Sequence, residues 1–244
     1  MSKIVLITGA SSGIGKSTAA FLASKNYTVY GTGRTPKSTA DDPYTLLPLD
    51  VTKIDSIEKV IQHIIAKEGR IDVLVNNAGL AAGLDNLENG DIDHWNRMID
   101  TNIKGLLYVS KAMIPLLKNT QGHIVNIGSI AGKEVYPNGN VYCGTKHMVD
   151  ALNKAMRREL AESGIKVSAV HPGAVETEFS IVRMDGDEEK ASKVYDGFEN
   201  LIAQDIADAI WFILSRPRHV NINELTIMPT AQPAAGVVIR NKGL

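Results

Sequence analysis

The sequence predicts the α/β fold class, with one parallel sheet of seven strands and helices on both of its faces. Short apolar runs alternate with longer segments of helical period along almost the whole chain of 244 residues. Most of the runs are apolar throughout, as expected for parallel strands that are covered on both sides. No internal repeat or inter-domain linker interrupts this alternation. Residues 1–244 are therefore expected to form a single doubly wound domain with right-handed crossovers.

The expected elements follow directly from these runs. Strands are expected at 4–8, 28–32, 45–49, 72–76, 123–127, 166–170 and 224–228. Helices are expected at 15–25, 54–68, 94–118, 143–162 and 205–215. The polar, charged segment 174–200 is interpreted either as a solvated loop or as a lid that closes over a substrate, because it follows a strand at the carboxyl edge of the sheet.

The composition excludes several classes of partner. Hydrophobic residues make up 44% of the chain and charged residues 22%, which is ordinary for a globular protein. A net charge of −1 offers nothing to attract a polyanion, so neither nucleic acid nor a membrane is expected as a partner. The first apolar run is too short for a secretion signal, and no stretch has the length of a membrane span. Cys143, the single cysteine, cannot form an intrachain disulfide, so a cytoplasmic location is expected.

A glycine-rich loop lies between the first expected strand and the first expected helix. Gly9 suits a tight turn, Gly13 a close backbone approach to a pyrophosphate, and Gly15 close packing of helix on strand. The amino end of the helix offers free N–H groups to phosphates. Glycine-rich turns alone are common, but this placement predicts a dinucleotide site of the Rossmann type. Its expected contacts are Gly9, Ser11, Ser12, Gly13, Ile14 and Gly15.

The end of the second expected strand favours NADP over NAD. An NAD enzyme would carry an Asp or Glu there to accept hydrogen bonds from the ribose hydroxyls. The chain instead has Arg34 followed by Thr35, with no acid beside them. A guanidinium pairs with a 2′-phosphate and stacks on adenine, although Arg34 could also be an ordinary surface charge.

Two further strand ends are expected to face the same cofactor. Asp50 and Val51 end the third strand, and Asp50 could accept from the adenine amino group. Asn77, Ala78 and Gly79 end the fourth, where small residues suit a backbone close to a ligand. Either motif alone could be a simple turn. No metal is expected at the site.

Tyr142 and Lys146 are the expected centre of the chemistry. Residues four apart at the start of a helix lie on one face. A phenol with an ordinary pKa of about 10 is a poor base at neutral pH, and a nearby ammonium stabilises the phenolate. Tyr142 is therefore expected to be the general acid/base for a substrate oxygen. Ser129, just after the fifth strand, can hydrogen-bond the same oxygen.

These motifs together resemble the short-chain dehydrogenase/reductase family over nearly the whole chain. The resemblance is carried by Thr8-Gly9-x-x-x-Gly13-x-Gly15, Asn76-Asn77-Ala78-Gly79, Asn102, Ser129, Tyr142-x-x-x-Lys146 and Pro172-Gly173. It implies that Lys146 also binds the nicotinamide ribose and that Asn102 holds a water in a proton relay. It further implies that Pro172, Gly173, Val175 and Thr177 line the nicotinamide. A homotetramer built partly from the helices around 94–118 and 143–162 is implied as well.

A narrower resemblance is to NADP-dependent 3-hydroxy acid dehydrogenases, which include L-serine dehydrogenases. It is carried by Gly139-Asn140-Val141-Tyr142, by Thr177-Glu178-Phe179-Ser180-x-Val182-Arg183-x-x-Gly186-Asp187, by His219-Val220-Asn221-Ile222-Asn223-x-Leu225 and by Met228-Pro229-x-x-Gln232. It implies an NADP-dependent oxidoreductase that oxidises a 3-hydroxy acid, such as L-serine or 3-hydroxypropionate, to a semialdehyde or 3-oxo acid, or catalyses the reverse reduction. The expected partner is therefore a small hydroxy acid or carbonyl compound. A carboxylate needs a cation, and Arg183 is the first candidate, with Lys193 the weaker one; Arg183 could equally be a surface charge or a charge on the cofactor side. Thr35 and His171 depart from that group, which often has a second basic residue and an acid at these places.

Two other functions remain open at this point. A catalytically silent NADP-binding sensor would need none of the set Asn102, Ser129, Tyr142 and Lys146, and would bind cofactor without turnover. A broad aldehyde or ketone reductase of the same fold would ignore a substrate carboxylate. It would then lose nothing on 3-hydroxy acids when Arg183 is replaced.

Overall fold

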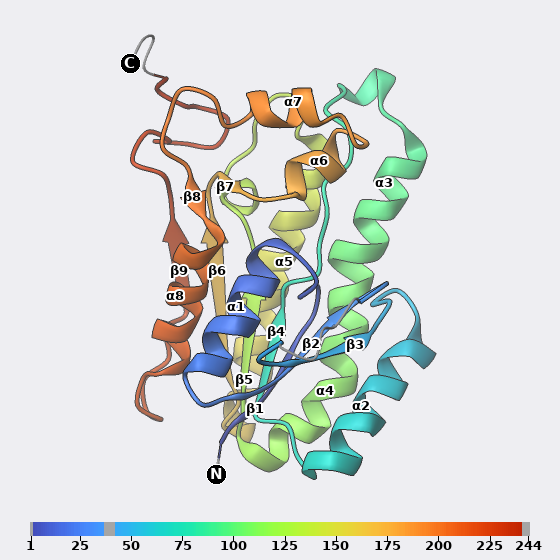
Figure 1. Cartoon of the computed structure of the whole chain (residues 1–244), viewed down its shortest axis with the longest axis vertical. Coiled ribbons are helices and arrows are strands. Elements are labelled where there is room, and N and C mark those ends of the chain that lie inside the picture. Colours follow the sequence, from blue (N-terminus) through green and yellow to red (C-terminus); the bar gives the residue numbers. More distant parts are fainter. Residues whose placement is uncertain (1, 37–41, 241–244) are drawn as a thin grey trace.

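The computed structural model describes residues 2–36 and 42–240. Within them, seven parallel strands form one sheet in the order β3-β2-β1-β4-β5-β6-β9 (Figure 1). The strands are β1 (Ile4–Ile7), β2 (Thr28–Gly33), β3 (Thr45–Pro48), β4 (Val73–Asn76), β5 (His123–Ile127), β6 (Lys166–Pro172) and β9 (Glu224–Ile227). The strand order reverses between β1 and β4, and ligands bind at such a switch point beyond the carboxyl ends of the strands.

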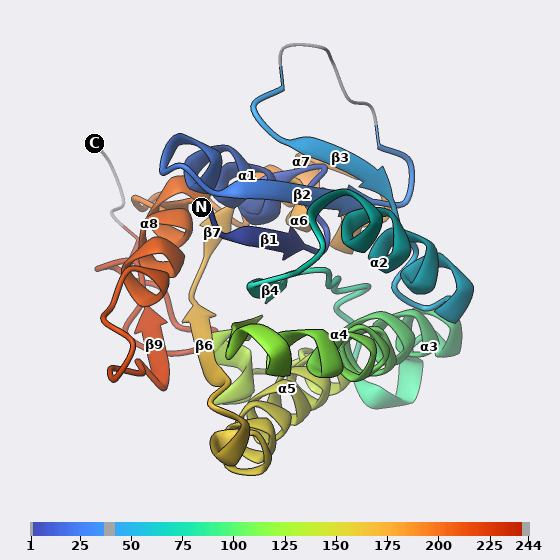
Figure 2. The same ribbon diagram turned by 90° about the horizontal axis from the view of Figure 1, so that it is seen from below.

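Two helical layers cover the sheet, as the sequence predicts (Figure 2). One face packs on α1 (Gly13–Ser24) and α8 (Ala203–Leu214), and the other on α2 (Ile54–Glu68), α4 (Leu106–Thr120) and α5 (Asn140–Glu159). Alternate strand residues serve the two cores, because successive side chains of a strand point to opposite faces. In β1, Leu6 packs with the α2, α4 and α5 layer, while Val5 and Ile7 pack with α1 and α8.

Most expected elements are confirmed, with shifts at their ends. The strand at 123–127 and the helix at 54–68 match the observed bounds, and β6 extends two residues further, to Pro172. The helix expected at 143–162 runs from Asn140 to Glu159 and is followed by the short turn η4 (Ala161–Ser163). The other short 3-10 turns are η1 (Leu87–Asn89) and η3 (Ile130–Gly132).

The helix expected at 94–118 is helical over its whole length, but its middle is not α-helical. The chain forms α3 (Ile92–Ile99), then the π-helical segment η2 (Asp100–Gly105), and then α4. A π segment widens one turn and shifts the side chains that follow it, and such segments are frequent at functional sites. Asn102 lies in this segment with its side chain buried.

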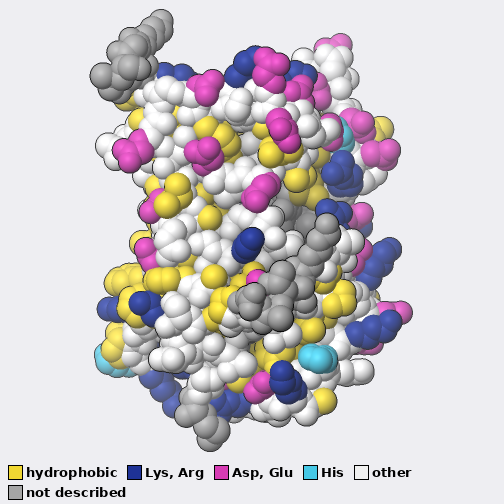
Figure 3. Space-filling view, in the orientation of Figure 1, with side chains coloured by type: hydrophobic (Ala, Val, Ile, Leu, Met, Phe, Trp, Pro, Cys, Tyr) yellow, Lys and Arg dark blue, Asp and Glu magenta, His cyan; other side chains and the backbone are white. Residues whose placement is uncertain are grey.

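The segment 174–200 contains short regular elements that the sequence pattern does not predict. It contains β7 (Val175–Glu176), α6 (Phe179–Arg183) and α7 (Glu188–Lys193). Its two ends meet where β7 pairs in parallel with β8 (Leu201–Ile202). We call residues 174–200 the lid. It stands above the carboxyl ends of the strands, and acidic side chains are scattered over this upper part of the surface (Figures 1 and 3).

No helix among the described residues is long and apolar enough to cross a membrane.

Candidate active site

The glycine-rich loop leaves no space for side chains. Gly9 has a φ of 69°, in the left-handed region that favours glycine. A Cβ atom on Gly15 would lie 2.2 Å from the carbonyl oxygen of Gly9. The Asn77 side-chain amide fixes the loop from β4 by donating to the carbonyl oxygens of Thr8 and Gly9 at 2.9 and 2.8 Å. Ala78 also approaches closely, because a Cβ on Gly9 would lie 2.9 Å from its Cα atom. At Gly9 and Gly15 the loop therefore carries no side chains of its own, and a ligand can approach its backbone closely.

The amino end of α1 adjoins this loop. The helix begins at Gly13, and Ser12 at its N-cap makes no side-chain capping hydrogen bond within the described chain. The first N–H groups of a helix have no partners inside the helix, and they carry the positive end of its dipole. Ile14 follows in the first turn, and Ser11 packs 2.9 Å from the place of a Cβ atom on Gly33. This arrangement fits a bound phosphate.

Arg34 and Asp50 lie at neighbouring strand ends, beyond β2 and β3. Arg34 and Thr35 are exposed, and the Arg34 guanidinium makes no hydrogen bond or ion pair with any described residue. Burial raises the pKa of Asp50, but hydrogen bonds from Thr52 and the charges of Lys53 and Arg34 hold it below its usual value. The Asp50 carboxylate accepts from the Thr52 N–H at 2.9 Å and from its hydroxyl at 2.7 Å. The adjoining Val51 is buried.

The acid/base candidates are buried together behind the lid. Burial raises the pKa of Tyr142, and Tyr136 beside it adds to this rise, whereas Ser129 and Arg183 act in the opposite direction. Burial lowers the pKa of Lys146 to about 8. Its ammonium donates to the Ile127 carbonyl oxygen at 3.0 Å. The sequence predicts that a nearby ammonium lowers the pKa of Tyr142. In the protein without cofactor the pKa is instead raised, because the effect of burial is larger.

Ser129 stands at the start of η3, which α5 holds in place. Its hydroxyl accepts from the Ala131 N–H at 3.1 Å. A Cβ atom on Gly132 would lie 2.5 Å from the Lys146 carbonyl oxygen, so the turn packs directly on the helix that carries Tyr142 and Lys146. The position of Ser129 relative to these two residues is thus fixed by close backbone packing.

Asn102 reaches the same place from η2. Its side-chain oxygen accepts from the Leu80 N–H at 2.8 Å, and its amide donates to the Leu80 carbonyl at 2.8 Å and to the Thr145 hydroxyl at 3.1 Å. A Cβ atom on Gly79 would lie 3.2 Å from the Asn102 oxygen and 3.6 Å from the Lys146 ammonium. Gly79 therefore leaves room for both side chains beside the end of β4.

The end of β6 brings the last group of expected contacts to the site. They are Pro172, which ends β6, Gly173 after it, and Val175 and Thr177 at the start of the lid. Thr177 faces the glycine-rich loop, since a Cβ on Gly13 would lie 3.3 Å from its side chain. Gln232, which in the sequence is only part of the narrower resemblance and has no predicted site role, accepts from the Ala174 N–H at 2.7 Å and holds this turn.

Arg183 folds inward from α6 and sits against two aromatic rings. Its guanidinium carbon lies 5.6 Å from the ring centre of Tyr136 and 5.5 Å from that of Tyr142. It donates to the Tyr136 hydroxyl at 3.0 Å and to the Gly83 carbonyl at 3.3 Å. The nitrogen Nη2 is buried without a partner among the described residues. Lys193, the weaker candidate, is 64% exposed and pairs with Glu189.

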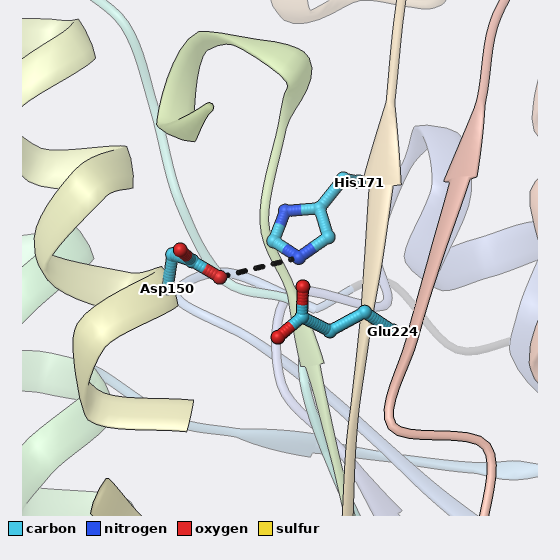
Figure 4. A group of neighbouring side chains, drawn as sticks. All are labelled: Asp150, His171 and Glu224. Atoms are coloured by element: carbon cyan, nitrogen blue, oxygen red, sulfur yellow. Dashed lines mark ion pairs between the residues drawn. The ribbon is translucent and has the colours of Figure 1, made fainter. Parts of the chain in front are cut away.

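A partly buried charged cluster lies behind Ser129 and Lys146. Asp150 on α5, His171 on β6 and Glu224 on β9 point toward one another (Figure 4). These three residue types also bind metals, but the Lys133 ammonium already lies 2.7 Å from Asp150 and 2.6 Å from Glu224. Burial lowers the pKa of His171 to about 4, so its imidazole is neutral at neutral pH.

This cluster joins the elements that carry the candidate residues. Lys133 directly follows η3, and Asp150 lies one turn after Lys146 on α5. His171 packs on Gly128, where a Cβ atom would lie 2.3 Å from its Nδ1 atom. The sequence signal for it was slight: the unusual histidine before Pro172, and an acid four residues after Lys146.

The fold and this site define the class of protein. Residues 3–187 match the short chain dehydrogenase family, and the chain belongs to that family.

Several dehydrogenases are similar to this chain over nearly its whole length. NADP-dependent 3-hydroxy acid dehydrogenase YdfG of Salmonella typhi is 40% identical over 244 residues, covering 97% of this chain and 98% of that protein. Serine 3-dehydrogenase of Agrobacterium fabrum is 37% identical over 97% of both chains. The solved closed form of serine dehydrogenase complexed with NADP+ superposes with a TM-score of 0.92 at 38% identity, covering 98% of this chain and 100% of that one.

Proposed function

We propose that this protein oxidises 3-hydroxy acids to the corresponding 3-oxo acids or semialdehydes with NADP, or reduces these products with NADPH. The observation that carries the proposal is the Arg183 guanidinium, which has a buried nitrogen without a partner among the described residues and lies against the ring of Tyr142. A buried, unpaired donor on a cation is costly unless an anion completes it. A carboxylate next to the reacting hydroxyl supplies that anion. The relatives named for 3-hydroxy acids and serine support the proposal.

The chain offers NADP a site that fits. The pyrophosphate would lie on residues 9–15, which form the glycine-rich loop and the start of α1. A Cβ atom on Gly15 would clash with the backbone of this loop. Arg34, which makes no ion pair within the described chain, would take the 2′-phosphate, and Thr35 lies beside it. Asp50 and Val51 would face the adenine. When bound, the cofactor supplies the hydride acceptor or donor for the substrate carbon. The other proposed contacts are Asn77, Ala78, Gly79, Tyr142, Lys146, Pro172, Gly173, Val175 and Thr177.

The residues of the chain then handle the proton and the substrate oxygen. Tyr142 would take the hydroxyl proton during oxidation and return it during reduction, and Ser129 would hydrogen-bond the same oxygen. A positive charge nearby favours the phenolate, but in the form without cofactor the effect of burial on the pKa of Tyr142 outweighs that of Arg183. Lys146 provides such a charge while it is protonated. Because its pKa is about 8, most of it is protonated at neutral pH. Asn102, fixed by Leu80 and Thr145, would hold a water of the relay to solvent.

The test compares Arg183→Met with Lys193→Met. Both replace a cation of the lid, but the second is exposed and paired with Glu189. With 3-hydroxypropionate and NADP, Arg183→Met should lower kcat/KM about 100-fold, since losing one partner of a buried charged pair costs ~3 kcal/mol. Lys193→Met should change it little, and a plain secondary alcohol should not distinguish the variants. Equal rates of wild type and Arg183→Met on the hydroxy acid would favour a broad carbonyl reductase instead.

The cofactor preference has a test of its own. Arg34→Ala should lower kcat/KM for NADP while leaving that for NAD nearly unchanged, because NAD has no 2′-phosphate for the guanidinium. An unchanged ratio of the two values would remove Arg34 from the proposed site. Cofactor binding without turnover on any hydroxy acid or aldehyde would instead indicate a sensor.

We also propose that the protein is a cytoplasmic homotetramer. The single cysteine, Cys143, is free and buried, which suits a reducing compartment. The exposed Met148 on α5 is an apolar contact available to another subunit. Sedimentation of the purified protein tests the assembly, and fractionation of the source cells tests the location.

A further inference from the structure

His94 supplies a second buried polar atom without a partner at the site of Arg183. The described pocket lined by Tyr142 and Arg183 is also lined by His94 and by the apolar side chain of Met98. The His94 nitrogen Nδ1 is buried and has no hydrogen bond to any described residue. Buried polar groups are normally hydrogen-bonded, so an unsatisfied one that lines a pocket needs an explanation, and a polar group of a ligand in the pocket would supply one.

Contacts on both sides hold the His94 ring against the lid. On one side, its Nε2 atom lies 3.4 Å from the Asp185 carboxylate, two residues after Arg183. On the other side, a Cβ atom on Gly83 would lie 3.0 Å from Nδ1. Gly83 is in turn joined to Arg183, because its N–H donates to the Arg183 carbonyl at 3.0 Å and its carbonyl accepts from the guanidinium. His94 and Arg183 are therefore parts of one rigid corner of the pocket.

The partner of Nε2 decides what Nδ1 can do. A carboxylate only accepts hydrogen bonds, so the contact with Asp185 favours a proton on the ring nitrogen Nε2. In the neutral imidazole the other nitrogen then has a lone pair and accepts. The pocket thus offers a substrate a donor on Arg183 and an acceptor on His94. Two carboxylates also lie at its rim, but Asp85 and Asp91 are exposed, and Asp91 caps α3.

We propose that His94 is a specificity-determining residue that recognises a hydrogen-bond donor on C2 of the substrate. The inference rests on the proposed function, in which Arg183 binds the carboxylate and Tyr142 the C3 hydroxyl. C2 lies between the carboxylate carbon and C3 of the substrate. An ammonium or hydroxyl group on C2 would donate the hydrogen bond that the His94 Nδ1 atom lacks. The preferred substrates are therefore 3-hydroxy acids with an amino or hydroxyl group on C2, such as L-serine, over 3-hydroxypropionate, which has no substituent there.

The experiment measures the ratio of kcat/KM for L-serine to that for 3-hydroxypropionate, both with NADP. His94→Phe keeps a ring but removes the acceptor, and it should lower this ratio about 10- to 100-fold, the range for a hydrogen bond to a charged group. His94→Asn places an amide oxygen near the position of Nδ1 and should restore part of the ratio. His63→Phe, on the exposed face of α2, is the matched control and should leave it unchanged.

Asp185→Asn is a second variant that does not change the pocket itself. Asp185 has a φ of 52°, which asparagine tolerates, so the lid should keep its conformation. The asparagine amide can accept from Nε2 or donate to it, so it no longer selects the tautomer with the proton on Nε2, and the ratio should fall by less than in His94→Phe. An unchanged ratio in folded His94→Phe and in Asp185→Asn would overturn the role of His94, while wild-type turnover of 3-hydroxypropionate would still support the proposed function. If the wild type oxidises neither acid, the proposed function fails and this inference fails with it.

Discussion

The buried ammonium of Lys146 should make the stability of the protein depend on pH in a predictable direction. Burial lowers its pKa from 10.5 to about 8. One pKa unit corresponds to ~1.4 kcal/mol, so the charged lysine costs the folded state about 3 kcal/mol at neutral pH. Between pH 8 and 10.5 the folded protein loses this proton before the unfolded chain does. The unfolded state then binds more protons, and stability rises with pH in this window.

The comparison of wild type with Lys146→Met isolates this effect, because methionine has no proton to lose. From pH 7 to pH 9, the free energy of unfolding of the wild type should rise by about 1 kcal/mol relative to the variant, as linkage with these two pKa values requires. Urea unfolding of both proteins without cofactor measures it. The variant itself should be the more stable of the two at pH 7, since it buries no charge.

Lys104→Met is the control of opposite sign. Lys104 is exposed, and its hydrogen bond to Asp100 raises its pKa. Any stability from that pair is present at neutral pH and is lost as the pH rises through the raised pKa, so the wild type should not gain on this variant between pH 7 and 9. If wild type and Lys146→Met keep the same difference at both pH values, the desolvation argument for Lys146 is refuted.

Two further predictions concern the loop and the charged cluster. Gly15→Ala should abolish NADP binding in a fluorescence titration while the chain still folds, because the added methyl would lie 2.2 Å from the Gly9 carbonyl; retained binding would show that the loop can open. Lys133→Met should lower kcat about 10-fold, because it breaks the contact that holds η3 to Asp150. A hydrogen bond of this kind contributes ~1–2 kcal/mol. If Lys133 acts by positioning Ser129, then adding Lys133→Met to Ser129→Ala should cost little more, and additive losses would contradict this.

Much of the architecture could be predicted because it depends on local patterns. The fully buried run of β5 and the helical period of α2 both set their elements to the observed residue bounds. The proposed cofactor loop was predictable for a similar reason: strand, glycine-rich turn and helix are consecutive in the sequence. Tyr142 and Lys146 are close in space because they are four apart on one helix.

The remainder depends on contacts between distant segments, which periodicity cannot detect. The π-helical turn that buries Asn102 looks like ordinary helix in its residue pattern. The cluster of Lys133, Asp150 and Glu224 joins residues far apart in sequence. His94, which the sequence argument passed over, becomes notable only when the lid brings Asp185 to its ring. The strands β7 and β8 have two residues each, too few to show alternation.

The pairing of β7 with β8 ties two parts of the candidate site together. Both ends of the lid leave from this small parallel pair. One part of the lid, at Thr177, lies against the glycine-rich loop, while another part, at Arg183, contacts Gly83 and Tyr136. A ligand that alters the lid at one of these contacts is therefore expected to change the affinity for a ligand at the other. By thermodynamic linkage, each ligand would change the affinity for the other by the same factor.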